Sequence, residues 1–189
     1  MSISPSLDDL AAATMEEIAR AAAHDAPPPV ERWHPGHCGH SAMRIARDGA
    51  WYHEGRPIRR PELVRLFSRI LRREPDGRHV LVTPAEMLEI DVEDAPFVAG
   101  EMKTEGKGAG RTIAFRLNTG DPLVAGPDHP IRVAMMPAGP RPTVLVRGGL
   151  EALIARPIYY ELAEIAIAEG ADPPGLWSDG AFFRLDGGP

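Results

Sequence analysis

Two amphipathic helices that open on the same Arg-Pro pair, 96 positions apart, constrain the fold of this chain more than any other feature. Arg60-Pro61 starts the first helix and Arg156-Pro157 starts the second. Proline is favoured at a first helical position because its missing N–H would have no helical partner there. The apolar residues of both segments then follow the spacing of a buried helical face. At this offset Leu63, Leu66, Phe67, Ile70 and Leu71 fall on Tyr159, Leu162, Ala163, Ala166 and Ile167.

This correspondence predicts a duplicated strand–helix–strand unit, with a chance likeness of two amphipathic helices as the alternative. The strand expected after each helix favours duplication, because Val80 falls on Leu176 at the same offset. Each unit has an apolar face that must be buried, most economically against the other unit. In the first helix, Leu66 and Phe67 are expected at the centre of the buried face, with the arginines of the helix away from it.

The first half of the chain predicts two helices and two pairs of strands. Ser6 and Asp9 have the spacing of a capping box, and the run of prolines at 27–29 ends the helix that follows. Asp48-Gly49 is a strong hairpin signal, because both turn positions need positive φ. The expected elements are a helix over 7–23, strands over 43–47 and 50–54, a helix over 61–73, and strands over 79–83 and 87–92.

After residue 96 the sequence is richer in strands, which glycines and prolines separate. The expected elements are strands over 97–103, 112–117, 131–135 and 143–147, a helix over 156–169, and a hairpin around Asp179-Gly180. The fold class is therefore α+β, with a mostly antiparallel sheet and a closing helix in the second half. We expect an N-terminal helix and proline-rich linker (1–30), an α+β domain (31–92) and a β-rich domain (93–189).

The composition argues against two classes of partner. The chain has 189 residues and a net charge of −6, whereas nucleic-acid binding requires a basic surface for phosphate contacts. No apolar stretch approaches the roughly 20 residues of a membrane-spanning helix. The single cysteine, Cys38, excludes an internal disulfide and favours a reducing compartment, so a cytoplasmic location is expected.

The charges are unevenly distributed along the chain. Residues 44–78 hold ten arginines against five acids, whereas residues 86–105 hold seven acids and only Lys103. One interpretation is two solvated faces of opposite sign that help the halves dock. The other is an anion-binding site, since guanidinium groups pair bidentately with phosphate or carboxylate.

Two short motifs invite a functional interpretation that their context does not favour. His34, His37, Cys38 and His40 include zinc-ligand types, but no second cluster completes a closed site, so a histidine-rich turn is favoured over a metal site. The glycine-rich segment 106–110 precedes an expected strand, whereas phosphate-binding loops open a helix. A hairpin loop is favoured, and no metal or cofactor is expected.

No catalytic signature is present, although carboxylates are dense in residues 86–94. Glu86, Glu89, Asp91, Glu93 and Asp94 would suit a paired-carboxylate site. Strand alternation, however, places the middle three of these on one face, which is typical of a solvent-facing strand. Among the aromatic residues, Trp51 and Tyr159 are expected in the core and Tyr160 as an exposed ring.

Five ordered blocks between residues 43 and 97 carry a family resemblance. They are Met43–Trp51 (MRIARDGAW), Gly55–Arg60 (GRPIRR), Leu63–Glu74 (LVRLFSRILRRE), Leu81–Pro84 (LVTP) and Val92–Phe97 (VEDAPF). On these blocks the chain resembles the bacterial domain-of-unknown-function family numbered 1285. The resemblance implies a duplicated core in two domains, with the second loosely like a pleckstrin-homology fold. It also implies a nucleotide-like ligand at the domain interface and a role in signalling.

The favoured hypothesis is a non-catalytic ligand-binding or signalling module that holds an anionic, nucleotide-like small molecule between two domains. Arg44, Arg60 and Thr83 would bind the anion, while Trp51 and Asp94 would shape the site. The alternatives are a protein–protein adaptor and a metal-dependent hydrolase that uses the carboxylates of residues 86–94.

Overall fold

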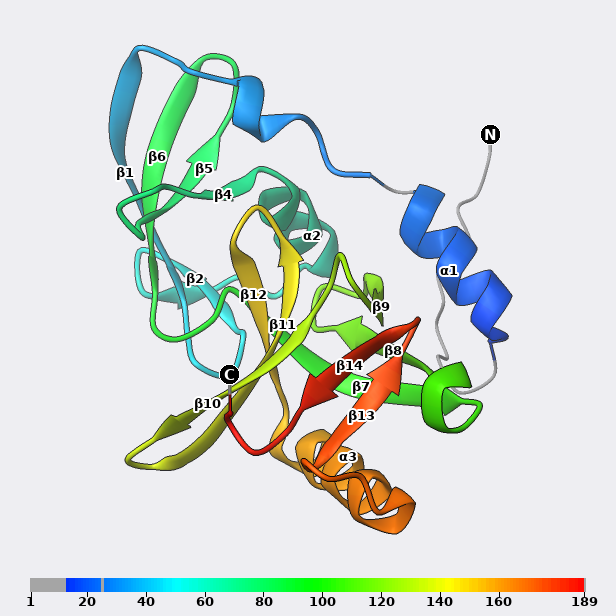
Figure 1. The fold of residues 1–189 in the computed structure, drawn as a ribbon. Helices are drawn as coiled ribbons and strands as arrows, with labels where there is room; N and C mark the ends of the chain where they lie inside the picture. Colours follow the sequence, from blue (N-terminus) through cyan, green and yellow to red (C-terminus); the bar gives the residue numbers. More distant parts are fainter. Residues whose placement is uncertain (1–12, 25, 189) are drawn as a thin grey trace.

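The structure is a computed structural model that describes residues 13–24 and 26–188. The first sheet has six strands in the order β3-β2-β1-β6-β5-β4 (Figure 1). These strands are β1 His37–Ile45, β2 Trp51–His53, β3 Arg56–Pro57, β4 Leu71–Arg73, β5 His79–Val82 and β6 Glu86–Val92. Helix α2, Pro61–Arg69, connects β3 to β4 and therefore joins the two opposite edges of this sheet.

The second sheet also has six strands, in the order β10-β11-β12-β7-β8-β9. These strands are β7 Phe97–Glu105, β8 Thr112–Leu117, β9 Pro122–Ala125, β10 Ile131–Met136, β11 Gly139–Arg147 and β12 Leu150–Ile154. Helix α3, Arg156–Glu169, follows the last strand, and a separate hairpin of β13 Gly175–Ser178 and β14 Ala181–Arg184 comes after it. The remaining elements are helix α1, Met15–His24, and the short 3₁₀ helices η1, Val30–Arg32, and η2, Gly108–Gly110.

The two sheets have the same strand order when each is numbered from its own first strand. In both, the first and sixth strands pair in parallel at the centre, β1 with β6 and β7 with β12, while the other pairs are antiparallel. The corresponding first strands begin at His37 and Phe97, 60 positions apart. The repeat in the topology therefore has a shorter period than the one that the helices suggested.

The pairing at an offset of 96 residues is wrong, because α2 and α3 occupy different places in the two halves. After α2 the chain continues into β4 and β5 of the six-stranded sheet, whereas after α3 it leaves the second sheet for the β13–β14 hairpin. Amphipathic helices share their apolar spacing whatever they pack against. The two helices are therefore alike because both are amphipathic, and they do not occupy equivalent positions in a repeated unit.

Most of the expected elements are present, with changes at their ends. The α+β class, the hairpin around Asp48-Gly49, the order of strands after residue 96, α3 and the last hairpin are confirmed. The helix expected over 61–73 ends at Arg69, because residues 71–73 form β4. β1 begins at His37, so the histidine cluster lies largely in a strand rather than in a turn. β9 and β12 were not expected.

The structure shows a capping box at α1, further along the chain than expected. Thr14 N donates to Glu17 Oε2 (2.8 Å), and Glu17 N donates to Thr14 Oγ1 (3.2 Å), which satisfies two N–H groups at the helix start. The helix begins at Met15, while Ser6, Asp9 and residues 7–12 lie outside the described residues. Ile18 is fully buried against Ala114 and fixes α1 on the second sheet. None of the described helices is long and apolar enough to cross a membrane.

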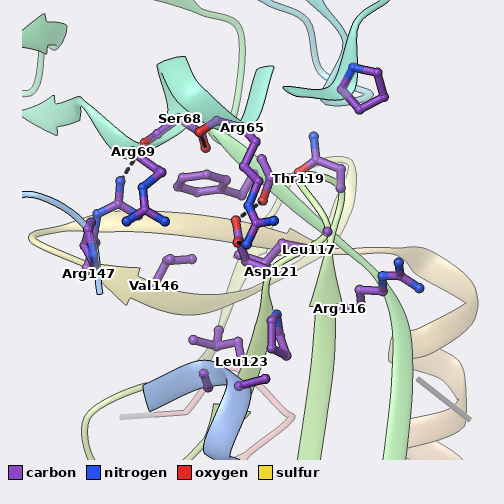
Figure 2. Close-up of a pocket in the computed structure, with 18 of the residues that line it drawn as sticks. Arg65, Ser68, Arg69, Arg116, Leu117, Thr119, Asp121, Leu123, Val146 and Arg147 are labelled. Atoms are coloured by element: carbon purple, nitrogen blue, oxygen red, sulfur yellow. Dashed lines mark hydrogen bonds and ion pairs between the residues drawn. The ribbon is translucent and has the colours of Figure 1, made fainter. Parts of the chain in front are cut away.

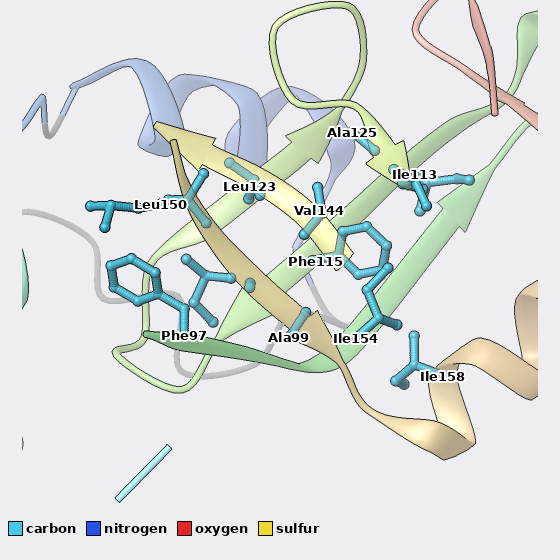
Figure 3. Close-up of a cluster of buried hydrophobic side chains, with 14 of the residues drawn as sticks. Phe97, Ala99, Ile113, Phe115, Leu123, Ala125, Val144, Leu150, Ile154 and Ile158 are labelled. Carbon is cyan, nitrogen blue, oxygen red and sulfur yellow. The ribbon is translucent and has the colours of Figure 1, made fainter. Parts of the chain in front are cut away.

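The largest cluster of buried side chains runs through both halves of the chain and is densest around the second sheet (Figure 3). Phe97, Phe115 and Ile154 are each no more than 1% exposed. From the first sheet, Trp51 is 2% exposed and stacks on Phe67 of α2, with 6.4 Å between the ring centroids. Trp51 therefore lies in the core, as expected.

The buried face of α2 is not the one that its apolar spacing predicted. Leu66, placed at the centre of that face, is 55% exposed, and Leu63 is 37% exposed. Ser68 is the only residue of α2 that is buried, while Phe67 is half-buried. Val64 and Phe67 of α2 are half-buried and pack against the main core, whereas Arg65 and Arg69 line an open space beside it.

Candidate functional site

A cavity of about 600 Å³ lies between the two halves of the molecule. Its walls come from α1 and residue 27, from α2, from β8 and the turn that leads to β9, and from the end of β11. Figure 2 shows Arg69 and Arg147 near each other and Arg65 beside Asp121, with Arg116 apart from them at the right. We call this cavity the interdomain cavity.

Four arginines from both halves line the interdomain cavity. Arg65 and Arg69 come from α2, Arg116 from β8, and Arg147 from the end of β11. Among the described residues of the lining only two carboxylates, Glu62 and Asp121, oppose them. The cavity wall therefore carries a net positive charge, although the chain as a whole is acidic.

Three of these arginines have contacts that connect different elements around the cavity, while Arg116 Nη1 lies 3.7 Å from Glu101 Oε2 within the second sheet. Arg65 Nη2 lies 3.2 Å from Asp121 Oδ1, across the boundary between the halves. Arg147 Nη2 donates to the carbonyl of Ser68 (2.6 Å), near the end of α2. Arg69 Nη2 donates to the carbonyl of Ala26 (2.8 Å), in the segment between α1 and the first sheet. The guanidinium groups are thus fixed in place before any ligand enters.

Arg147 has the most unusual environment of the four arginines. Its guanidinium lies 5.7 Å from the centroid of the Phe97 ring, and its Nε is buried with no hydrogen-bond partner. Burial lowers the pKa of Arg147 below its ordinary value, and the nearby charge of Arg69 lowers it further, while Asp121 and Glu31 act in the opposite direction. An anion placed near Arg69 and Arg147 would offset their mutual repulsion.

The interdomain cavity also has an apolar part of its lining. It comes from Ala21 and Ala22 of α1, from Leu123 of β9, and from Pro27 and Pro122, which follow Ala26 and Asp121 in the chain. Figure 2 shows Leu123 beside α1 and on the other side of the cavity from Arg69 and Arg147. The cavity therefore has one cationic side and one apolar side.

Of the five residues that the sequence analysis selected, none lines the interdomain cavity. The guanidinium of Arg44 forms an ion pair with Glu93 and lies 4.3 Å from the centroid of the Tyr52 ring. Trp51 is buried in the core. Arg60 is exposed immediately before α2, beside a shallow hollow formed with residues 53–59 and Leu63.

Thr83 and Asp94 also have structural contacts of their own. Thr83 lies in the β5–β6 turn, where its Oγ1 accepts from the N–H of Glu86 (3.2 Å). Asp94 Oδ1 accepts from Arg141 Nε (2.8 Å), which ties the linker between the sheets to β11. In the pairing of β1 with β6, Arg44 lies beside Asp91. His37, seven residues before Arg44 on β1, lies beside Glu86, close to Thr83 in the chain. At about 3.3 Å per residue, Thr83 is on the order of 20 Å from Arg44, so the structure does not bring these five residues together.

Four of the five carboxylates of residues 86–94 lie beside basic side chains, including Asp94 beside Arg141. Glu89 accepts from Arg78 (3.1 Å), Asp91 lies 3.7 Å from His40 Nε2, and Glu93 pairs with Arg44. Within residues 13–24 and 26–188, no group of three or more His, Cys, Asp or Glu side chains is arranged to hold a metal ion. These contacts use two of the ten arginines of residues 44–78, Arg44 and Arg78, in ion pairs along the first sheet.

The glycine-rich segment 106–110 has a structural role. It forms η2 and leads into β8, as a hairpin loop would. The N–H of Gly108 donates to Glu169 Oε1 (3.1 Å) at the end of α3, and the same carboxylate pairs with the buried Arg111. The loop thus binds a carboxylate of its own chain.

The arginines of the cavity could not be predicted from the sequence for two reasons. Arg65 and Arg69 were placed on a solvated face, because Leu66 was expected to point inward. Arg116 and Arg147 stand alone in β-rich segments, where a single arginine has no local signal. A sequence clue did exist at Arg147, which ends an apolar strand directly before Gly148-Gly149.

Comparison with known proteins identifies the family. Residues 28–95 match the model "Domain of unknown function (DUF1285), N-terminal domain", and residues 96–185 match "Protein of unknown function (DUF1285), C-terminal domain". No curated protein matches the chain. The resemblance noted between residues 43 and 97 is confirmed and extends through the second half.

Two solved structures are similar to this one. The crystal structure of a DUF1285 family protein from Silicibacter pomeroyi DSS-3 is 44% identical, with a TM-score of 0.75, over 92% of this chain and 95% of that one. A DUF1285 family protein from Shewanella baltica OS155 shares the fold at 19% identity, with a TM-score of 0.51, over 66% of this chain and 91% of that one. The chain therefore belongs to the DUF1285 family, with one N-terminal and one C-terminal domain of that family.

Proposed function

We propose that this protein is a non-catalytic ligand-binding module that holds an anionic small molecule in the interdomain cavity. The observation that carries the proposal is the convergence of Arg65, Arg69, Arg116 and Arg147, two from each domain, on one cavity of about 600 Å³. This volume is typical of small-molecule sites. Guanidinium groups are the side chains best suited to bind carboxylate or phosphate.

A ligand held by both domains would connect them, which supports a role in signalling. A bound anion would add contacts between α2 and the β8–β9 turn, so that ligand binding stabilises one arrangement of the domains. A cytoplasmic location and a C-terminal domain similar to a pleckstrin-homology fold belong to the same proposal, while the nucleotide-like ligand that the family resemblance implies is one of the two ligand classes to be distinguished by experiment. They are supported by the family resemblance and by the single cysteine, Cys38.

The proposal is tested by thermal unfolding of the purified full chain with a panel of anions, namely inorganic phosphate, AMP, ATP, citrate and aliphatic carboxylates. A ligand at about one hundred times its Kd stabilises the folded state by roughly 2.7 kcal/mol. The variants Arg69→Gln and Arg116→Gln are expected to lose most of this ligand-dependent shift. Arg132→Gln is the matched control, because Arg132 is exposed on β10 and does not line the cavity.

Two results would contradict the proposal. One is the absence of any shift with every anion in the panel. The other is an equal shift in Arg69→Gln, Arg116→Gln and Arg132→Gln, which would place the anion elsewhere on the surface.

A protein–protein adaptor is the second candidate, because α3 has an exposed apolar face. Tyr160 and Ile167 lie seven residues apart on this helix and are 57% and 76% exposed. A photo-crosslinking residue at position 167 is expected to capture a defined partner, whereas the same residue at the exposed position 128 captures none. Equal capture from both positions would remove this candidate.

A further inference from the structure

We propose that the anion is amphipathic, with a single carboxylate or phosphate head group on an apolar body, rather than a nucleotide. This inference rests on the proposed function, because it concerns the chemistry of the ligand in the same cavity. It depends on three observations, namely the hydrogen bonds already made by the neutral polar side chains, the apolar wall, and the position of the cationic side.

The neutral polar side chains of the cavity are already used within the protein. Ser68 Oγ donates to the carbonyl of Arg65 (2.8 Å), and Thr119 Oγ1 donates to Asp121 Oδ2 (2.6 Å). Asn118 Oδ1 accepts from the N–H of Val98 (2.9 Å), and its Nδ2 donates to the carbonyl of Gly49 (3.0 Å). Recognition of a base and a ribose requires neutral donors and acceptors at defined positions, and these side chains would have to give up existing bonds to supply them.

The cavity offers little aromatic surface for stacking a base. Phe97 is the one Phe, Tyr or Trp among the described residues that line the cavity, and it is 1% exposed. Trp51 and Phe67 stack on each other. The half-buried imidazole of His129, whose Nδ1 lies 3.1 Å from the Leu145 carbonyl, is the remaining ring of the lining. Stacking on aromatic side chains is the usual source of affinity for a base without specific hydrogen bonds, so a base would have only this small ring to stack on.

The apolar wall suits the body of an aliphatic or aromatic acid. Ala21 and Ala22 of α1 line it together with Leu123 of β9, and small alanine side chains leave room for a ligand. The wall is held in place because Ile18, on the same helix, is fully buried in a cluster with Ala114 and Val124. The apolar side is thus built on fixed elements rather than on a loop.

The arrangement of the two sides sets the orientation of the ligand. The head group lies near Arg69 and Arg147, where burial and like charge make an anion most favourable. The body extends toward Leu123, which lies on the other side of the cavity from these arginines in Figure 2, and toward the alanines of α1 that also line the cavity. Affinity should therefore depend on both the charge of the head group and the length of the apolar chain.

The test is isothermal titration calorimetry of the full chain with acetate, hexanoate, octanoate and decanoate, each below its micellar concentration. Decyl phosphate distinguishes the two head groups, decanol removes the charge, and AMP represents the nucleotides. We expect affinity to rise about three- to fourfold for each methylene buried along the series. Decanoate or decyl phosphate should bind at least about tenfold more tightly than decanol and AMP, which is the effect of one charge-assisted hydrogen bond.

Matched variants locate the body and the head group. Ala22→Gln places a polar side chain on the apolar wall and should weaken decanoate about tenfold, while acetate changes less than about twofold. Ala19→Gln, on the exposed part of the same helix and outside the cavity lining, should change neither. Arg69→Gln should weaken every charged member of the series.

The outcomes separate this inference from the proposed function. If AMP or acetate binds as tightly as decanoate and Arg69→Gln weakens it, the cavity is an anion site but the apolar body is not recognised, and the inference fails alone. If decanol binds as tightly as decanoate, the charge requirement fails. If no anion binds at all, both the inference and the proposed function are overturned.

Discussion

Helices α2 and α3 start with the same Arg-Pro pair, yet α3 has three apolar side chains buried in the core, whereas the apolar side chains of α2 that pack against the core are only half-buried. Ile158, Leu162 and Ala166 of α3 are at most 8% exposed, at the i, i+4, i+8 spacing of one helical face. In α2 the only buried residue is Ser68, while Leu66 is 55% exposed. α3 therefore packs within its own domain, whereas α2 lies between the two domains.

This difference explains where a ligand can enter the fold. A helix that packs fully against a sheet leaves no space, since protein interiors are close-packed. The side of α2 that faces the C-terminal domain presents Arg65 and Arg69 instead of apolar residues, and these meet Asp121 and the main chain of Ala26. The incomplete packing of α2 is what leaves the interdomain cavity open.

The largest stability effect is expected in α3. Leu162 is fully buried in the main core, so Leu162→Ala should lower the free energy of unfolding by about 2–5 kcal/mol. Ile167→Ala is the control on the same helix, because Ile167 is 76% exposed and should cost less than about 0.5 kcal/mol. Urea unfolding monitored by circular dichroism measures both, and equal costs would remove the view of α3 as scaffold.

Phe67→Ala should be the most harmful substitution in α2, but less harmful than Leu162→Ala. Phe67 is half-buried and stacks on Trp51 at 6.4 Å, so the expected cost is about 2 kcal/mol, below the roughly 3–5 kcal/mol of a fully buried phenylalanine. The same urea titration measures it. A cost above that of Leu162→Ala would show that α2 is core scaffold after all.

A contact between the domains is tested by Gly49→Ala. Gly49 has φ +84°, and a Cβ there would lie 2.5 Å from Nδ2 of Asn118, whose side chain bonds the Gly49 carbonyl. A non-glycine residue in this conformation costs about 1–2 kcal/mol before any clash. Gly55→Ala is the matched control, because Gly55 has φ +76° and nothing within 4 Å of its Cβ.

The expected result is a larger loss of unfolding free energy in Gly49→Ala than in Gly55→Ala, because only the first also displaces Asn118. Equal losses would show that the contact between the hairpin turn and the β8–β9 turn contributes nothing to the docking of the domains.

The sequence predicted the elements well, and it predicted the site poorly. Strand alternation, turn signals and the proline at the start of each helix depend on local chemistry, so the hairpin at Asp48-Gly49 and the helix at 156–169 were found. Which face of a helix is buried depends on what lies beside it, so Leu66 was placed inside and Arg69 outside. Arg147 reaches the cavity only through the packing of β11 against α2, which no local pattern encodes.

The N-terminal domain is expected to lose stability in mild acid through His79. Burial lowers the pKa of His79, and the nearby Arg73 lowers it further, so the folded state binds the proton less readily than the unfolded chain. The stability is fully present above the ordinary histidine pKa of about 6.5 and is lost as the pH falls from there through the lowered value. Thermal unfolding between pH 7.5 and 5 should show this loss, and His79→Gln should reduce it. An unchanged pH dependence in His79→Gln would assign the loss to other groups.

The smallest effect is expected for Leu66→Ala. Leu66 is 55% exposed, so the cost should lie within about 0.5 kcal/mol, despite its place in the apolar pattern of α2. The comparison with Phe67→Ala, its neighbour in the chain, needs only the same unfolding experiment. A cost near that of Phe67→Ala would mean that Leu66 is covered in solution.

Hydrogen exchange measured by mass spectrometry tests most directly whether one ligand contacts both domains through α2 and the β8–β9 turn, while α3 is only scaffold. The exchange is compared with and without saturating decanoate, and AMP is the second probe. Residues 61–69 and 117–123 should therefore become protected together, while residues 156–169 exchange at an unchanged rate. Protection confined to one domain, or centred on residues 156–169, would contradict the claim.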